Sequence, residues 1–390
     1  MNPDTNTLMP STTLRQEVLR KARRLVVKVG SQLLTSPRGG LDLESMRRIS
    51  DQVAELLRRG IDVTLVSSGA ISTGMGVLNL PRKPKDIGAL QAVAAVGQIG
   101  LMDRWHELFG RHSIEVAQIL LTREDVENRK RYLNIRNCIA ELHRIGALPI
   151  INENDTVSVD EIRLGDNDIL AAMVTNALPA DALVILSVVD GLHDAQGAVV
   201  EIVRDVAAVR AMVGGHKSEM GSGGMGTKLE AARMVTDAGE VAVIASGREP
   251  DVLLRLIEGE KLGTVFVPAT RKLPSRRRWI GQAVRPSGTI VVDDGAARAI
   301  AHDGRSLLAS GITEVVGVFE KGDIVVVRDG RGLELARGLI NYDSTEARAI
   351  LGKRSSQFEK LLGRKAYDEV IHRNNMVIAQ PETRNPEQIA

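Results

Sequence analysis

The chain has 390 residues, which exceeds what one ordinary hydrophobic core organises and predicts two domains. Its 51 Lys and Arg residues balance 49 Asp and Glu residues, so bulk charge excludes a general polyanion-binding protein. Hydrophobic residues make up 43% and charged residues 26% of the chain, which excludes a disordered or collagen-like composition.

The first 22 residues are predicted to be a disordered N-terminal extension. Residues 1–18 contain no apolar core of the length that a signal peptide has. No later run reaches the length of about 18 apolar residues that a membrane span needs. The single cysteine, Cys138, excludes an intramolecular disulfide and a cysteine-based zinc site, and it favours a reducing, cytoplasmic location. Its helical-looking surroundings predict a small buried side chain. The scattered histidines show no metal-binding spacing, so no protein-ligated transition metal is predicted.

From residue 24 onwards, short apolar runs alternate with amphipathic segments, and each run ends in Gly, Ser, Asn or Asp. The predicted strands are residues 25–29, 61–66, 148–151, 182–187 and 241–245. A helix is predicted between the first two strands, ended by Gly60. Its apolar stripe is Met46, Ile49, Val53, Leu56 and Leu57. This alternation predicts an α/β domain over residues 23–270, with a mostly parallel sheet that binds ligands at its carboxyl edge.

The sequence pattern changes after residue 267. Residues 271–278 are rich in arginine without apolar periodicity and are predicted to be a basic linker. Two strand-like runs, 289–292 and 323–327, follow, and residues 329–332 predict a hairpin turn. We therefore expect a small, mainly β domain over residues 279–380 and a tail over residues 381–390.

Lys28 lies in the middle of an apolar run, where a buried ammonium without a partner would cost on the order of several kcal/mol. A group of opposite charge must therefore be near it. Lys28 is either half of a structural ion pair or a phosphate-binding lysine at a strand end, and the Gly30-Ser31 turn behind it favours the second. The turn at Ser67 and Ser68 could also present hydroxyl and N–H groups to an anion.

Two polar turns, Asn152-Glu153-Asn154-Asp155 and Gly165-Asp166-Asn167-Asp168, are expected to lie close to one another. Acidic loops at this spacing repel unless a cation lies between them, and a substrate ammonium, Mg²⁺ or a lysine could each supply that charge. The alternative is two solvated turns, with Asn167 or Asp168 as the N-cap of the next helix.

Residues 221–228, Gly-Ser-Gly-Gly-Met-Gly-Thr-Lys, contain the densest glycine cluster. No strand precedes them and no Ser or Thr follows Lys228, so neither a dinucleotide fingerprint nor a Walker A loop fits. They predict a loop that leads into a helix starting near Thr227, whose free N–H groups and dipole favour phosphate. A plain flexible loop is the alternative.

Together, two lysines, two glycine-containing turns and acidic loops predict phosphoryl transfer, which depends mostly on positioning and charge neutralisation. No Ser-His-Asp or Cys-His set competes with this interpretation. A carboxylate acceptor would need no general base, because a carboxylate is already ionised at pH 7.

In order and spacing, six motifs resemble those of the glutamate 5-kinase family of the amino-acid kinase superfamily. The motifs are residues 26–31, 67–71, 120–123, 151–155, 165–168 and 223–228. The resemblance covers about residues 23–380, and the segment with Gly311-Ile312, Val316-Gly317-Val318-Phe319 and Ala336-Arg337-Gly338-Leu339 looks like a PUA domain. It implies an α/β/α sandwich followed by a small, mainly β PUA-like domain.

The resemblance also implies ATP-dependent phosphorylation of the side-chain carboxylate of L-glutamate with Mg²⁺, as the first step towards proline. Proline inhibition and a homo-oligomer are implied as well. Lys28 and Lys228 would be catalytic, and Ser68, Asp155 and Asn167 would bind glutamate, with Asp155 on its ammonium. The nucleotide site would consist of Lys28, Ser187, Ser222, Gly223, Gly224, Met225, Gly226, Thr227 and Lys228.

One departure from the family pattern is Val188, which stands where the family usually has aspartate and therefore implies weaker ATP binding. A related kinase for aspartate or N-acetylglutamate is one alternative, against which the PUA-like tail argues. The other is an RNA-binding protein that uses the basic linker and the PUA-like tail. Near-neutral net charge and an aromatic content of 2% argue against RNA binding.

Overall fold

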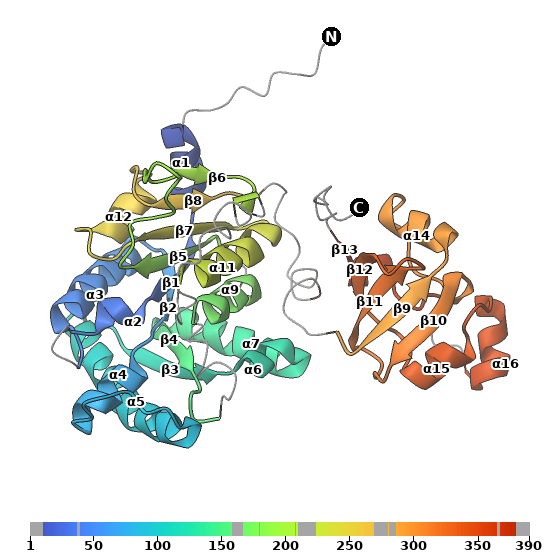
Figure 1. Ribbon diagram of the computed structural model, residues 1–390, viewed down its shortest axis with the longest axis horizontal. Coiled ribbons are helices and arrows are strands. Elements are labelled where there is room, and N and C mark those ends of the chain that lie inside the picture. The colour runs from blue at the N-terminus through green and yellow to red at the C-terminus, as the bar shows by residue number, and fades with distance from the viewer. Residues whose placement is uncertain are drawn as a thin grey trace, which may run out of the picture. The chain divides into compact units, whose positions relative to one another are not determined.

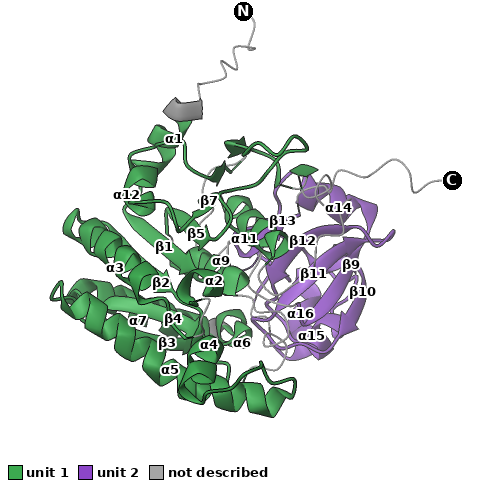
Figure 2. Cartoon of the chain, turned by 60° about the vertical axis from the view of Figure 1, so that its left-hand side comes forward, with its two compact units in different colours: residues 1–273 green, residues 274–390 purple. Residues whose placement is uncertain are grey.

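The structure is a computed structural model, and it describes residues 11–36, 40–157, 167–178, 180–206, 208–209, 224–268, 280, 286–364 and 367–379. The chain divides into two compact units, residues 1–273 and 274–390 (Figure 2). Each unit buries an apolar cluster of its own.

The first unit is built on an eight-stranded sheet with the strand order β3-β4-β2-β1-β5-β7-β8-β6 (Figure 1). Neighbouring strands are parallel except for the pair β7 and β8. The strands are β1 Arg24–Val29, β2 Asp62–Val66, β3 Val116–Leu121, β4 Leu148–Glu153, β5 Ala182–Ser187, β6 Ile202–Val203, β7 Val241–Ser246 and β8 Thr264–Phe266. The five strands predicted from apolar runs are confirmed. The others escaped prediction because Gln118 interrupts β3 and because β6 and β8 are too short for a periodic signal.

Helices cover both faces of this sheet, which confirms the expected α/β/α sandwich. Figure 1 shows α3 and α12 on one face, and α7, α9 and α11 on the other. The helices are α1 Ser11–Leu19, α2 Ser31–Leu34, α3 Leu43–Arg58, α4 Ala70–Val77, α5 Ile87–Gly110, α6 Arg123–Glu127, α7 Arg129–Ile145, α9 Asn167–Ala177, α11 Met225–Asp237 and α12 Val252–Ile257. Within the described part of the chain, none of the helices has the length and apolar character needed to cross a membrane.

The helix predicted between the first two strands is α3, and its local sequence explains its limits. Asp42 caps its start by accepting a hydrogen bond from the Ser45 N–H. Gly60, with φ of 74°, takes the left-handed conformation just past its end, which glycine adopts without strain. The predicted apolar stripe is buried against the sheet, apart from Leu57, which is partly buried.

The N-terminal segment differs from the prediction of disorder over residues 1–22, because residues 11–19 form α1. Arg15 on this helix is 1% exposed, and its guanidinium donates to four backbone carbonyls, those of Glu201, Glu260, Leu262 and Gly263, at 2.7 to 3.3 Å. The helix therefore holds the β6–β8 edge of the sheet. The prediction was wrong here because the partners that bury Arg15 lie about 200 residues away in the chain.

Cys138 is also a correction, because its side chain is exposed on α7 rather than buried. The neighbouring Ile139 is fully buried and Tyr132 is 5% exposed, so these residues define the inward face of the helix. Cys138 lies one position before Ile139, which turns it about 100° away from that face.

The second unit contains a five-stranded sheet with the order β10-β9-β11-β12-β13. The strands are β9 Gly288–Val292, β10 Ile312–Gly317, β11 Ile324–Asp329, β12 Glu334–Leu339 and β13 Met376–Ile378, and the helices are α14 Asp294–Ala301, α15 Ser344–Ala349 and α16 Phe358–Leu362. The predicted hairpin is confirmed: β11 and β12 are antiparallel, and the Asp329 carboxylate accepts from the N–H groups of Arg331 and Leu333 inside the turn. The unit is thus mainly β, as expected.

Candidate active site

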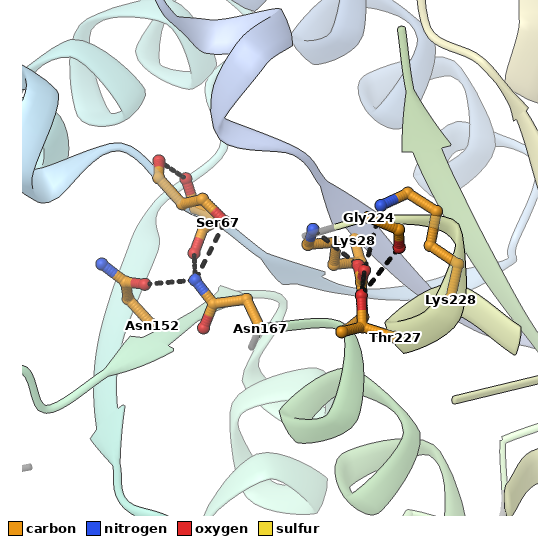
Figure 3. Close-up of polar contacts among 9 residues, drawn as sticks. Lys28, Ser67, Asn152, Asn167, Gly224, Thr227 and Lys228 are labelled. Carbon is orange, nitrogen blue, oxygen red and sulfur yellow. Dashed lines mark hydrogen bonds and ion pairs between the residues drawn. The ribbon is translucent and has the colours of Figure 1, made fainter. Parts of the chain in front are cut away.

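Lys28, Asp168 and Lys228 form a buried charged cluster at the carboxyl end of β1, here called the lysine–aspartate centre. Lys28 Nζ lies 2.6 Å from Asp168 Oδ1, and Lys228 Nζ lies 3.1 Å from Asp168 Oδ2. Each lysine is 4% exposed and Asp168 is fully buried. Figure 3 shows Lys28, Thr227 and Lys228 converging on this point. The partner that the burial of Lys28 required is therefore Asp168.

Three elements supply the lysine–aspartate centre. Lys28 is near the end of the central strand β1, Asp168 is in the first turn of α9, and Lys228 is in the first turn of α11. The Thr227 hydroxyl lies 3.0 Å from both Asp168 Oδ2 and the Gly224 carbonyl, so it braces the start of α11 against the carboxylate. A Cβ on Gly30 would lie 3.3 Å from the Leu186 carbonyl, which is tighter than most contacts, so glycine lets the chain after β1 pass close to β5.

The electrostatics of the centre favour an anionic ligand. Burial alone would raise the pKa of Asp168, but the charges and hydrogen bonds of Lys28 and Lys228 outweigh it and hold that pKa below its usual value. The carboxylate is therefore ionised at neutral pH. Two ammonium groups share one carboxylate, so two positive charges lie close together in a water-poor environment.

A second cluster, here called the amide cluster, consists of Ser67, Ser68, Asn152 and Asn167 (Figure 3). Asn167 Nδ2 lies 3.1 Å from the Ser67 carbonyl, 2.9 Å from Ser68 Oγ and 3.1 Å from Asn152 Oδ1. The cluster thus joins the carboxyl ends of β2 and β4 to the start of α9. Because Asn167 precedes Asp168, it lies directly beside the lysine–aspartate centre.

Of the predicted glutamate-binding residues, Ser68 and Asn167 are in direct contact, while Asp155 is half-buried just beyond the end of β4. Of the predicted nucleotide-binding residues, Lys28, Thr227 and Lys228 meet at the lysine–aspartate centre. Ser187 ends β5, and its carbonyl accepts from the Gly247 N–H at 2.9 Å. Gly224, Met225 and Gly226 form the start of α11. Ser222 and Gly223, like Gly165 and Asp166, lie outside the described residues.

Two boundaries differ from the predictions. α11 begins at Met225 rather than near Thr227, because Gly224 adopts an extended conformation and serves as the N-cap. The polar turn expected from Asn152 begins two residues later, because β4 continues through Asn152 and Glu153, which are 2% and 8% exposed. Both residues are paired in register with β3, so the ladder continues into polar sequence.

Sequence reasoning left three contributors to the site unassigned: Asp168, Gln98 and Trp105. The sequence places Asp168 in an acidic loop that needs a cation nearby. It does not show that Lys28 and Lys228 supply this positive charge. Trp105 donates from Nε1 to Ser67 Oγ at 2.9 Å, and Gln98 accepts from Asn152 Nδ2 at 2.8 Å. The sequence feature that could have indicated Gln98 is its position as a polar residue on the apolar face of a long helix.

Val188 packs against the hydrophobic core of the first unit and is half-buried. The valine is therefore accounted for by packing. Nearby, His193 Nε2 lies 2.8 Å from Asp190 Oδ1, so the carboxylate that follows Val188 contacts histidine.

No group of three or more His, Cys, Asp or Glu side chains that could hold a metal ion occurs in the part of the chain that the structure describes. Asp168, the carboxylate of the charged centre, is engaged by two lysines.

Comparison with known proteins agrees with this geometry. Residues 23–246 match the amino acid kinase family, and residues 288–362 match the PUA domain. The first match covers more than half of the chain and contains both clusters of the site. The fold and the site therefore define an amino acid kinase with a C-terminal PUA domain.

The sequence relatives narrow the class further. The chain is 46% identical over 374 residues to a glutamate 5-kinase from Chromohalobacter salexigens, which covers 94% of the chain and 99% of that relative. It is 47% identical over 370 residues to a glutamate 5-kinase from Methylibium petroleiphilum, with 93% and 100% coverage. A glutamate 5-kinase from Thermoanaerobacter is 44% identical over 364 residues, with 92% and 98% coverage. The chain belongs to the glutamate 5-kinase family.

Proposed function

We propose that this chain catalyses ATP-dependent phosphorylation of the side-chain carboxylate of L-glutamate, the first step of proline biosynthesis. The observation that carries the proposal is the buried lysine–aspartate centre, in which two lysines contact one carboxylate, directly beside the amide cluster. The lysine–aspartate centre suits a transferring phosphoryl group, and the amide cluster suits a small polar acceptor. Relatives named glutamate 5-kinase over nearly their whole length support the same reaction.

In this reaction the two lysines stabilise the transferring phosphoryl group. Its transition state spreads negative charge over the phosphoryl oxygens, so catalysis depends on fixed positive charges around them. Asp168 contacts both Lys28 and Lys228 and holds the two ammonium groups in place. Because the acceptor carboxylate of glutamate is ionised at pH 7, no residue has to remove a proton from it.

Glutamate is proposed to bind through Ser68, Asp155 and Asn167, with Asp155 on its ammonium group. α4 supports this placement, because it begins directly after Ser68 and Gly69. Gly69 is the N-cap, with φ of 107° and no side chain to cap the first turn. The N–H groups of that turn, and the positive end of the helix dipole, favour a substrate carboxylate.

ATP is proposed to bind at Lys28, Ser187, Ser222 and Gly223 and at the helix start formed by Gly224, Met225, Gly226, Thr227 and Lys228. The described part of this set lies at the carboxyl edge of the sheet, at the ends of β1 and β5 and the start of α11. Mg²⁺ would be carried by the phosphates of ATP and would neutralise their charge.

The test is the release of ADP by the purified chain with Mg²⁺-ATP and L-glutamate, with hydroxylamine present to trap acyl phosphate as hydroxamate. Glutamate-dependent hydroxamate is expected, together with a lower yield when proline, the proposed inhibitor, is added. L-Aspartate and N-acetylglutamate serve as matched acceptors. No hydroxamate with any of the three, or a preference for aspartate, would overturn the assignment.

Val188 provides a prediction about the nucleotide. If the valine weakens ATP binding, Val188→Asp should lower the KM for ATP by about tenfold, the effect of one added charge-assisted hydrogen bond. Val188→Thr, which keeps the shape of the side chain, is the control and should leave KM close to wild type. Equal KM values for wild type and Val188→Asp would dismiss the hypothesis.

We also propose that the chain assembles into homo-oligomers through its first unit. α4 and α5 carry exposed large apolar side chains, of which Ile99 is 68% exposed and Val77 is 59% exposed. Ile99→Glu should therefore reduce the oligomer mass in sedimentation velocity experiments. Leu308→Glu, an exposed leucine of the second unit, is the matched control. A wild-type monomer, or an unchanged mass for Ile99→Glu, would contradict this surface as the interface.

The family assignment favours the kinase over an RNA-binding protein, so nucleic-acid binding is not part of the proposal. The proposed location is the cytoplasm. The exposed thiol of Cys138 agrees with a reducing compartment, where it would stay reduced.

A further inference from the structure

Gln98 occupies an unusual place on α5. Ala94, Leu101 and Trp105 lie four residues before it and three and seven residues after it, and all three are buried against the sheet. This spacing puts Gln98 on the same inward face of the helix. Its Nε2 atom is buried and has no hydrogen-bond partner within the described residues. A buried amide donor without a partner destabilises the fold, so the placement of Gln98 needs another explanation.

The contact that Gln98 does make leads into the amide cluster. Its Oε1 accepts from Asn152 Nδ2 at 2.8 Å, and Asn152 Oδ1 accepts from Asn167 Nδ2 at 3.1 Å. Asn152 is 2% exposed, so neither of its polar atoms has free access to water. Figure 3 shows the Asn152 nitrogen on the side away from Asn167, which is the side that Gln98 satisfies.

The direction of donors and acceptors along this relay is determined. The Ser67 carbonyl can only accept, so Asn167 must turn its Nδ2 towards it. Asn152 must then present Oδ1 to Asn167, and its own Nδ2 faces the Oε1 of Gln98. The remaining atom, Asn167 Oδ1, is a buried acceptor without a hydrogen-bond partner among the described residues.

We propose that Gln98 is a positioning residue for the α-ammonium group of the substrate: it holds Asn152, Asn152 holds Asn167, and Asn167 Oδ1 accepts from the ammonium. This inference rests on the proposed function, because it assigns one group of the glutamate substrate. A substrate ammonium, on which the proposed function also places the Asp155 carboxylate, supplies the donor that Asn167 Oδ1 lacks.

α5 is well suited to this role because it is held firmly against its neighbours. A Cβ on Gly97 would lie 1.9 Å from the Ala70 carbonyl, so the helix touches the start of α4 backbone to backbone. Trp105, seven residues after Gln98, donates a hydrogen bond to Ser67 at the end of β2, and Gln98 accepts one from Asn152 at the end of β4. One helix face thus sets the spacing of both strand ends.

The test compares Gln98→Met, which keeps the shape but removes the acceptor, with Gln98→Glu, which keeps an acceptor oxygen for Asn152. Gln118→Met, at an exposed glutamine on β3, is the matched control for the same chemical change. Each variant of the full chain is assayed for the KM of glutamate, the KM of ATP and kcat. Glutarate, which has both carboxylates of glutamate but no ammonium, is used as a competing inhibitor.

For Gln98→Met, the KM of glutamate should rise about tenfold, while kcat, the KM of ATP and the Ki of glutarate stay within about twofold of wild type. Gln98→Glu should restore most of the affinity for glutamate, and Gln118→Met should match wild type throughout. An unchanged KM in Gln98→Met would overturn the inference, and so would an equal loss for glutamate and glutarate. If wild type binds glutamate in a calorimetric titration without turning it over, the proposed function fails and the same comparison is made on binding constants.

Discussion

Replacing Lys28 with methionine should lower kcat by about 100- to 1,000-fold, the usual effect of removing one preorganised group that stabilises transition-state charge. Methionine fills a similar volume but carries no charge, and Lys28 is too buried for water to replace its ammonium. The KM of glutamate should change by less than about threefold, because the amide cluster is intact. Steady-state rates of ADP release measure both constants.

Two further variants define what the Lys28 result means. Lys28→Arg keeps the charge, but its planar guanidinium is larger than the ammonium that lies 2.6 Å from Asp168 and places its charge differently. Its kcat should therefore fall between those of wild type and Lys28→Met. Lys21→Met is the matched control, because Lys21 is an exposed lysine near the start of the same unit. A kcat within about threefold of wild type for Lys28→Met would remove Lys28 from the catalytic machinery.

Asp168→Asn should both destabilise the chain and lower kcat by at least about 100-fold. The substitution preserves shape but leaves two buried ammonium groups facing each other, and removing one partner of a buried ion pair costs about 3–5 kcal/mol. Repulsion would also displace Lys28 and Lys228 from their positions for phosphoryl transfer. Thermal unfolding and steady-state kinetics give the two effects separately. Asp190→Asn, an exposed carboxylate beside His193, is the control and should match wild type in both.

The same variant gives a pH prediction. The pKa of Asp168 is lowered in the folded chain, relative to about 3.9 in an unfolded one. The stability it contributes is therefore fully present above that unfolded value and is lost as the pH falls through the lower folded value. The difference in melting temperature between wild type and Asp168→Asn should be constant from pH 5 to pH 8 and shrink below about pH 4. A difference that stays constant in acid would contradict an ionised, lysine-bound carboxylate.

Much of the fold could be predicted because burial leaves a local pattern in the sequence. The apolar runs that became β1, β2, β4, β5 and β7 are each long enough to show that both faces of a strand are covered. The stripe on α3 similarly indicates one buried helix face. Cys138 shows the limit of this reasoning, because one position on a helix separates a buried side chain from an exposed one.

The site was predictable in its chemistry and only partly in its contacts. The burial of Lys28 demanded a negative partner, and the motifs around Ser68, Asn167 and Lys228 pointed to phosphoryl transfer to an amino acid. That the partner is Asp168, shared with Lys228, follows from the packing of α9 and α11 at the end of β1. Residues 140 and 60 positions apart in the chain meet there.

What the sequence determined by itself is therefore five of the eight strands of the first unit, the family, and the need for charge compensation around one lysine. The tertiary structure alone decided which carboxylate pairs with that lysine, how Arg15 joins the N-terminal helix to the sheet edge, and how Gln98 contacts the amide cluster. The physical reason is that periodicity indicates whether a side chain is buried, whereas the identity of its partner depends on which distant elements the sheet brings together.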